Sequence, residues 1–174
     1  TGRIMLRYLA TLMVMLFPVT APAQTTSNDA AWPNKPVRFV VPFPAGSSTD
    51  VVARIVGQML AARLGQQFVI DNRAGASGNL GSDAVARAAP DGYTIGIATT
   101  STHALAPNLS ANLPYDPVRD FATVSMIGSA PYVMVTYPGL ETKSVQDFVA
   151  LARSKPGTLT FGSAGPASLA HLAG

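Results

Sequence analysis

The sequence contains no cysteine and few charged residues. The absence of thiols among 174 residues excludes disulfide bonds and thiolate metal sites within this chain. Lys and Arg number 12 and Asp and Glu number 9, and leaving out Arg3 and Arg7 gives 10 basic against 9 acidic residues, a formal charge of +1. Since no cluster of basic residues stands elsewhere in the chain, the composition argues against a nucleic-acid partner.

Histidine is also scarce, because His103 and His171 are the only two. The chain has no HExxH pattern, and neither histidine has an acidic residue close to it in the sequence. These absences favour packing or a ligand hydrogen bond over metal binding, so we expect no metal site. We also expect no cofactor. A Walker A lysine loop is missing, and the glycine-rich stretch 75–81 has Ser77 where a dinucleotide-binding loop needs its second glycine.

The first 23 residues have the layout of a secretory signal. Two arginines are followed by an apolar run over residues 8–17, and Ala21-Pro22-Ala23 gives the small-x-small pattern of a cleavage site. A membrane anchor is the alternative, but the apolar run is about half of the roughly 20 residues that a span requires. We therefore expect a signal peptide over residues 1–23, a polar leader over 24–36, and export to the periplasm.

Residues 37–103 alternate between apolar runs and amphipathic stretches. This pattern predicts strands over 37–42, 67–71 and 93–99, with helices over 49–64 and 79–89 between them. The order β-α-β-α-β implies a parallel sheet with right-handed crossovers, and hence an α/β domain.

The periodicity also predicts which helix faces lie against the sheet. In the first helix the inward stripe is expected to be Val52, Ile55, Val56, Met59, Leu60 and Leu64, with Gly65 as the C-cap. In the second helix the expected inward residues are Leu80, Ala84, Val85 and Ala88.

Residues 104–174 read as a second, incomplete domain. The pattern predicts a short helix near 104–109, a helix over 144–154, strands over 132–137 and 159–162, and a last helix that begins after a loop at 163–168. These elements are too few to close a sheet. We therefore expect the sequence to be a fragment of a longer protein.

Two loops of small residues, 43–50 and 163–168, each join a predicted strand to a predicted helix. The free N–H groups and the dipole at a helix start favour an anion, and the first loop contains no Lys or Arg. Either loop taken alone is better explained as an ordinary strand-to-helix turn, since such turns in α/β proteins commonly contain small residues. If the two units face each other, both helix starts converge on one crevice at the carboxyl ends of the strands, where α/β proteins bind ligands.

Several residues in these loops have a structural reading beside the functional one. Asp50 falls in the first helical turn, where a carboxylate compensates the dipole or caps amides, or contacts a ligand. The hydroxyls of residues 47–49 either cap the helix or point into the crevice. Residues 99–103, at the end of the third strand, lie at the same sheet edge and also form the natural crossing between the two units.

Four segments of the chain resemble the solute-binding receptors of tripartite tricarboxylate transporters, also called Bug-type periplasmic binding proteins. They are WPNKPVRFVVPFPAGSSTDVVAR, VIDNRAGASGNLGSDAVARAAPDGYTI, LPYDPVRDF and FGSAGPASLAHLAG, in the expected order over residues 32–174. The resemblance implies a bilobal α/β fold of the type II periplasmic-binding-protein kind, here truncated, with domains over 37–103 and 104–174. The family's first loop is usually AGGxxD, and Ser47 replaces the second glycine here.

The resemblance also implies a function and a set of ligand contacts. Family members close on a small organic carboxylate, partly through bridging water, and deliver it to permease subunits in the membrane. We expect such a receptor to be a monomer when complete, and not an enzyme. The matching positions are Phe43, Ala45, Gly46, Ser47, Ser48 and Asp50, then Ser101, Thr102 and His103, then Ser163, Ala164, Gly165, Ser168 and His171.

Two alternative functions are also consistent with the sequence. A receptor of this kind can present its ligand to a membrane histidine kinase instead of a permease. A periplasmic hydrolase that uses Ser163 and His171 is the other alternative, although Phe161 stands where the nucleophile elbow needs its first glycine.

Overall fold

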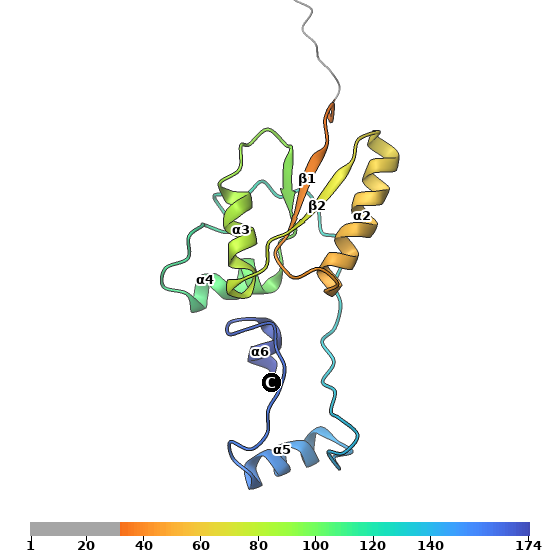
Figure 1. The fold of residues 1–174 in the computed structure, drawn as a ribbon. Coiled ribbons are helices and arrows are strands. Elements are labelled where there is room, and N and C mark those ends of the chain that lie inside the picture. The colour runs from red at the N-terminus through yellow and green to blue at the C-terminus, as the bar shows by residue number, and fades with distance from the viewer. Residues whose placement is uncertain (1–31) are drawn as a thin grey trace, which may run out of the picture. The chain divides into compact units, whose positions relative to one another are not determined.

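The computed structural model describes residues 32–174 (Figure 1), so the predicted signal peptide and most of the predicted leader lie outside the described residues. Three short strands form one sheet: β1 (Val37–Val41), β2 (Phe68–Asn72) and β3 (Thr94–Gly96). The strand order is β2-β1-β3, and both pairings are parallel. The predicted parallel β-α-β-α-β unit is therefore confirmed.

Helices α2 (Ser48–Leu64) and α3 (Asn79–Ala86) connect these strands. Gly65 ends α2 with a φ of 72° and donates its N–H to the carbonyl of Ala61, so the predicted C-cap is confirmed. Helix α3 ends three residues before the predicted boundary. The two helices lie on opposite faces of the sheet. Phe39 and Val41 pack on Ala53 of α2, whereas Gly96 of β3 lies against Val85 of α3.

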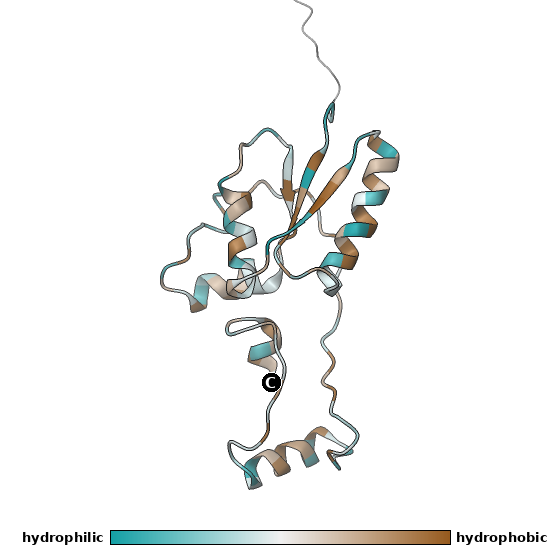
Figure 2. Ribbon diagram, viewed as in Figure 1, coloured by the Kyte–Doolittle hydropathy of each residue, from teal (hydrophilic) through white to brown (hydrophobic). Residues whose placement is uncertain are grey.

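The face that α2 turns to the sheet differs from the prediction. Ala53 and Gly57 are buried, whereas Ile55 is 54% exposed and Met59 is 57% exposed. Val52 and Leu64 are also exposed, while Val56 and Leu60 are partly buried, so only these two of the predicted stripe lie inward. Small residues occupy the contact: Ala53 packs on β1, and Gly57 lies against β2, where an added Cβ would be 3.5 Å from Ile70 Cδ1. Figure 2 shows the apolar residues of α2 and the strands in brown.

Helix α3 repeats this arrangement. Leu80, predicted to face inward, is exposed, and the buried residues are Gly81 and Ser82. A Cβ at Gly81 would lie 2.7 Å from the Cα of Pro42, so only a residue without a side chain fits between α3 and the end of β1. Ala84 and Val85 are partly buried, as expected.

Beyond β3 the chain contains helices and extended segments. The π-helix η3 (Thr100–Leu105) continues into α4 (Ala106–Leu109), and α5 (Val145–Ser154) and α6 (Leu169–Ala173) follow. Within residues 32–174 the predicted strands over 132–137 and 159–162 are not formed. These two predictions are wrong for this chain because a strand needs a neighbour to satisfy its backbone groups, and no described segment pairs with either.

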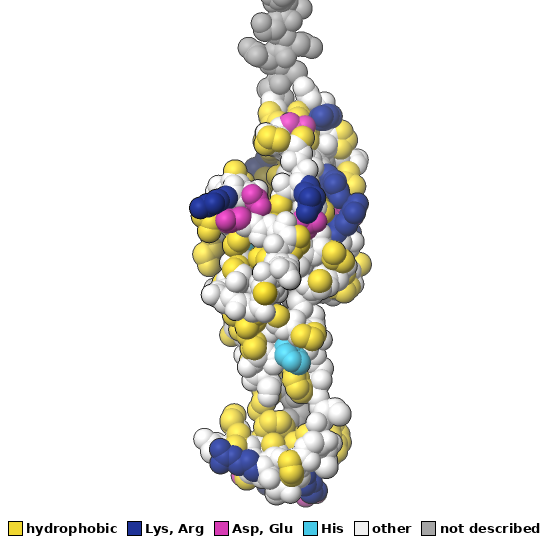
Figure 3. All heavy atoms as spheres, turned by 90° about the vertical axis from the view of Figure 1, so that its left-hand side faces the viewer, with side chains coloured by type: hydrophobic (Ala, Val, Ile, Leu, Met, Phe, Trp, Pro, Cys, Tyr) yellow, Lys and Arg dark blue, Asp and Glu magenta, His cyan; other side chains and the backbone are white. Residues whose placement is uncertain are grey.

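Charged side chains are interspersed on the face drawn in Figure 3, where basic residues lie beside acidic ones. Arg87, for example, donates Nε–H to Asp83 Oδ1 at 2.8 Å. Among residues 32–174, no helix has the length and apolar character that a membrane crossing needs.

Candidate functional site

The loop between β1 and α2 presents free backbone donors. Ser47 is the N-cap of α2, and its hydroxyl accepts from the N–H of Asp50 at 3.3 Å. The N–H groups of Ser48 and Thr49 have no hydrogen-bond acceptor in the part of the chain that the structure describes. These donors sit at the positive end of a helix of 17 residues. These donors and the helix dipole favour an anion at this loop, and anion binding there stays a prediction.

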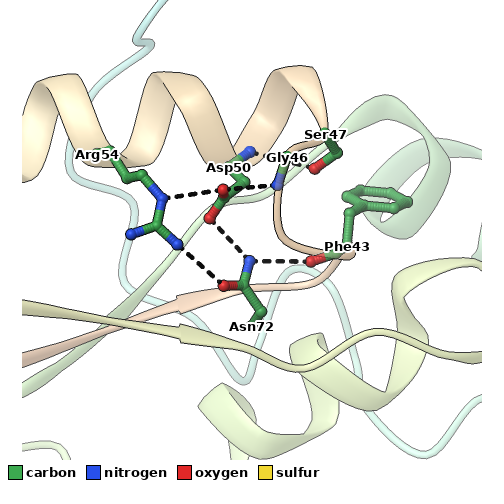
Figure 4. A network of polar contacts seen from close by, with 6 residues as sticks. All are labelled: Phe43, Gly46, Ser47, Asp50, Arg54 and Asn72. Carbon is green, nitrogen blue, oxygen red and sulfur yellow. Dashed lines mark hydrogen bonds and ion pairs between the residues drawn. The ribbon is translucent and has the colours of Figure 1, made fainter.

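Asp50 lies within this loop in a closed polar network (Figure 4). Its Oδ2 accepts from the backbone N–H of Gly46 at 2.9 Å and from Arg54 Nε at 2.9 Å. Its Oδ1 accepts from Asn72 Nδ2 at 2.9 Å. The same Asn72 nitrogen donates to the backbone carbonyl of Phe43 at 3.1 Å. The Asp50 side chain is 3% exposed, so its carboxylate is largely enclosed by these donors.

These contacts set the ionisation of Asp50. The hydrogen bond from Arg54, followed by those from Gly46 and Asn72, lowers the pKa of this carboxyl to about 2. Asp50 is therefore ionised at neutral pH, and Arg54 supplies its counter-charge. Sequence reasoning singled out neither Arg54 nor Asn72, although both lie in the segments that carry the family resemblance.

The end of the third strand forms a second polar cluster. Thr99 caps η3, and its side chain and that of Thr102 form a reciprocal capping box. Ser101 and Thr102 are buried, and the Thr102 hydroxyl lies 2.9 Å from Nδ1 of His103. The ring of His103 packs edge-on against Phe121, with the centroids 4.6 Å apart, and burial lowers its pKa below the ordinary value.

The predicted residues of the second loop surround the start of α6. Ser168 is its N-cap, is buried, and accepts from the N–H of His171 at 3.2 Å. Ser163 Oγ lies 3.2 Å from Nδ1 of His171 and also accepts from the N–H of Gly165 at 3.3 Å. Ala164 is exposed beside them.

Two hydrogen bonds join this second loop and the start of α6 to earlier parts of the chain. The N–H of Leu169 donates to Ser101 Oγ at 3.2 Å, and the hydroxyl of Ser77 donates to the carbonyl of Pro166. The start of α6, directly after the second loop, and η3 are therefore brought together. Within residues 32–174, no hydrogen bond links the first loop to residues 163–168, and no group of three His, Cys, Asp or Glu is arranged to hold a metal ion.

Solved structures of two bacterial proteins resemble this chain. Rpa4515 of R. palustris, solved with adipate, matches with a TM-score of 0.70 and 40% identity over 74% of this chain and 43% of that one. MatC from Rhodopseudomonas palustris, solved with bound malate, matches with a TM-score of 0.68 and 36% identity over 71% of this chain and 42% of that one.

Comparison of sequences also finds similar proteins. BugT of Bordetella pertussis is 38% identical over 161 residues, which are 92% of this chain and 49% of that protein. The chain thus spans about half the length of the curated relatives it matches. Residues 52–174 match the family model described as the tripartite tricarboxylate transporter family receptor. The resemblance drawn from the sequence is confirmed: this chain belongs to the tripartite tricarboxylate transporter receptor family.

Proposed function

We propose that this chain is part of a periplasmic receptor that binds a small organic carboxylate at the start of α2. The observation that carries the proposal is the pair of N–H groups, from Ser48 and Thr49, that have no acceptor within the described residues. A carboxylate at this position accepts from both and meets the positive end of the helix dipole. The malate and adipate bound to two relatives support this ligand class.

The remaining contacts come from the other two polar segments. We assign Ser101, Thr102 and His103 to one side of the ligand, and Ser163, Gly165 and Ser168 to the other. Support comes from the hydrogen bond between Leu169 and Ser101, which joins these segments. His103 then acts as a neutral hydrogen-bonding group, because burial lowers its pKa. Bridging water completes the shell where backbone and ligand are too far apart for direct contact.

Delivery to a membrane permease is part of the proposal and is supported by the family to which the chain belongs. Members of this family are substrate-binding receptors and not enzymes. The contact between Ser163 and His171 therefore needs another explanation. Ser163 also accepts from Gly165, and His171 packs on Phe161 with ring centroids 5.4 Å apart, so both residues brace the loop before α6.

The proposal is tested by removing one N–H group from the start of α2. Ser48 is the first residue of α2. Proline is well tolerated at the first position of a helix, so the substitution removes the backbone N–H and leaves the helix intact. We expect S48P to weaken malate or adipate binding about tenfold relative to S48A, the value of one hydrogen bond to a charged group. Calorimetry on the complete gene product measures this.

The matched control is V145P, which places proline at the first position of α5. This variant is expected to bind as the wild type does. A wild-type protein that binds neither malate nor adipate, or that binds the uncharged adipamide equally well, would contradict the proposed anion site.

A further inference from the structure

The network around Asp50 has a consequence for how the loop before α2 works. We infer that Asp50 is a positioning residue, which sets the shape of residues 43–47 through Arg54 and Asn72 and does not itself contact the ligand. This inference rests on the proposed function, because it assigns a role within the same anion site.

The Asp50 carboxylate accepts three hydrogen bonds within this chain. The donors are the Gly46 N–H in the loop, Arg54 Nε one helical turn later, and Asn72 Nδ2 at the end of β2. Loop, helix and strand thus meet at one side chain that is 3% exposed. Three donors and an exposure of 3% leave little of this carboxylate within reach of a ligand.

The network holds the loop at both ends. Asn72 Nδ2 donates to the carbonyl of Phe43 at 3.1 Å, and Asp50 Oδ2 holds the N–H of Gly46. Gly46 has a φ of 83°, in the left-handed region where glycine is strongly favoured, although a Cβ there would meet no atom within 4 Å. The glycine is therefore required by the backbone conformation, and that conformation is fixed by Asp50.

Electrostatics alone makes the opposite prediction for Asp50. A negative charge in the first turn of α2 repels an anion bound at the same helix start. If that repulsion were its main effect, Asp50→Asn would tighten anion binding. If Asp50 positions the loop, the same change weakens binding, because the new amide N–H₂ must face at least one of three donors.

The chain offers a matched control in Asp83→Asn. Asp83 also pairs with an arginine four residues later, Arg87, and the Nε to Oδ1 distance is 2.8 Å. Its ion pair lies on α3 and has no bond to residues 43–47. Both variants remove the charge of an aspartate that pairs with an arginine four residues later. Asp83 is more exposed, at 24% of its side chain, and only D50N changes a group that contacts residues 43–47.

The experiment measures malate and adipate affinity by calorimetry and Gly46 N–H exchange by NMR, on the complete gene product. We expect D50N to weaken binding about tenfold or more and to speed Gly46 exchange, while D83N stays within about twofold of the wild type in both. A second variant, N72A, keeps the Asp50–Arg54 pair but frees Phe43, and is expected to weaken binding several-fold. N72A tests the positioning role of the network if D50N does not fold.

The outcomes distinguish a failure of the positioning role of Asp50 from a failure of the proposed function. Unchanged or tighter binding by D50N or N72A, or unchanged Gly46 exchange in D50N, overturns the positioning role. If the wild type binds neither acid, the proposed function fails. Faster Gly46 exchange in D50N would then still support the role of Asp50 in fixing the loop.

Discussion

The hydroxyl of Tyr115 donates a hydrogen bond of 2.6 Å to the backbone carbonyl of Thr102. Tyr115 is buried, and its ring also packs edge-on against Phe121 and beside His103. This hydroxyl, which also lies 2.9 Å from Asn79 Oδ1 of α3, ties the segment after α4 to the π-helix η3. Helix η3 carries the predicted site residues Ser101, Thr102 and His103. The shape of the cluster at the end of β3 therefore depends on a residue that the sequence pattern did not single out.

The first prediction concerns this tie. Tyr115→Phe keeps the ring but leaves the buried Thr102 carbonyl without the hydroxyl, so the free energy of unfolding should fall by about 1–3 kcal/mol. Urea denaturation measures the change. Tyr132→Phe is the control, because Tyr132 is exposed and its hydroxyl has no hydrogen bond among those of residues 32–174. That variant should stay within about 0.5 kcal/mol of the wild type. Equal stability of the two variants would refute the structural role of the Tyr115 hydroxyl.

The second prediction concerns the close approach of α3 to the end of β1. A Cβ at Gly81 would lie 2.7 Å from Pro42 Cα and 2.9 Å from the carbonyl oxygen of Arg73. Both neighbours are backbone atoms, so Gly81→Ala must push the helix away and should lower the free energy of unfolding by about 1–3 kcal/mol. Thermal or urea unfolding tests this.

Gly128 provides the control for Gly81, since no atom lies within 4 Å of a Cβ built there. Gly128→Ala should change stability by less than about 0.5 kcal/mol. If Gly81→Ala changes the free energy of unfolding as little as Gly128→Ala does, α3 does not pack closely on Pro42.

Local chemistry made part of this structure predictable from the sequence. Ser47 caps α2 and Gly65 ends it because a hydroxyl acceptor and a left-handed glycine act within one helical turn. The parallel sheet followed from the alternation of strands and helices, because such alternation leaves few other topologies.

Features that depend on distant neighbours were not predictable in this way. Asn72 meets Asp50 across 22 residues of sequence, and no local pattern announces the contact. The inward face of α2 was assigned to large apolar residues, but the small residues Ala53 and Gly57 lie there, against β1 and β2. The strand predicted over 132–137 had the right composition and lacked only a partner. The ligand contacts and the division into two domains stay predictions.

The last prediction follows the ionisation of Asp50. Its pKa in the folded protein is lowered from 3.8 to about 2, mainly by Arg54, so the unfolded chain binds a proton at this site more readily than the folded protein does. The stability that Asp50 contributes should therefore be fully present above about pH 4 and should be lost as the pH falls toward 2. Asp71 and Asp116, whose pKa values are also lowered, add to the same slope in every variant. The informative quantity is the difference between wild type and Asp50→Asn in unfolding free energy, measured from pH 5 to pH 2. This difference should shrink with acid, and a constant difference would mean that Asp50 does not carry the ion pair with Arg54.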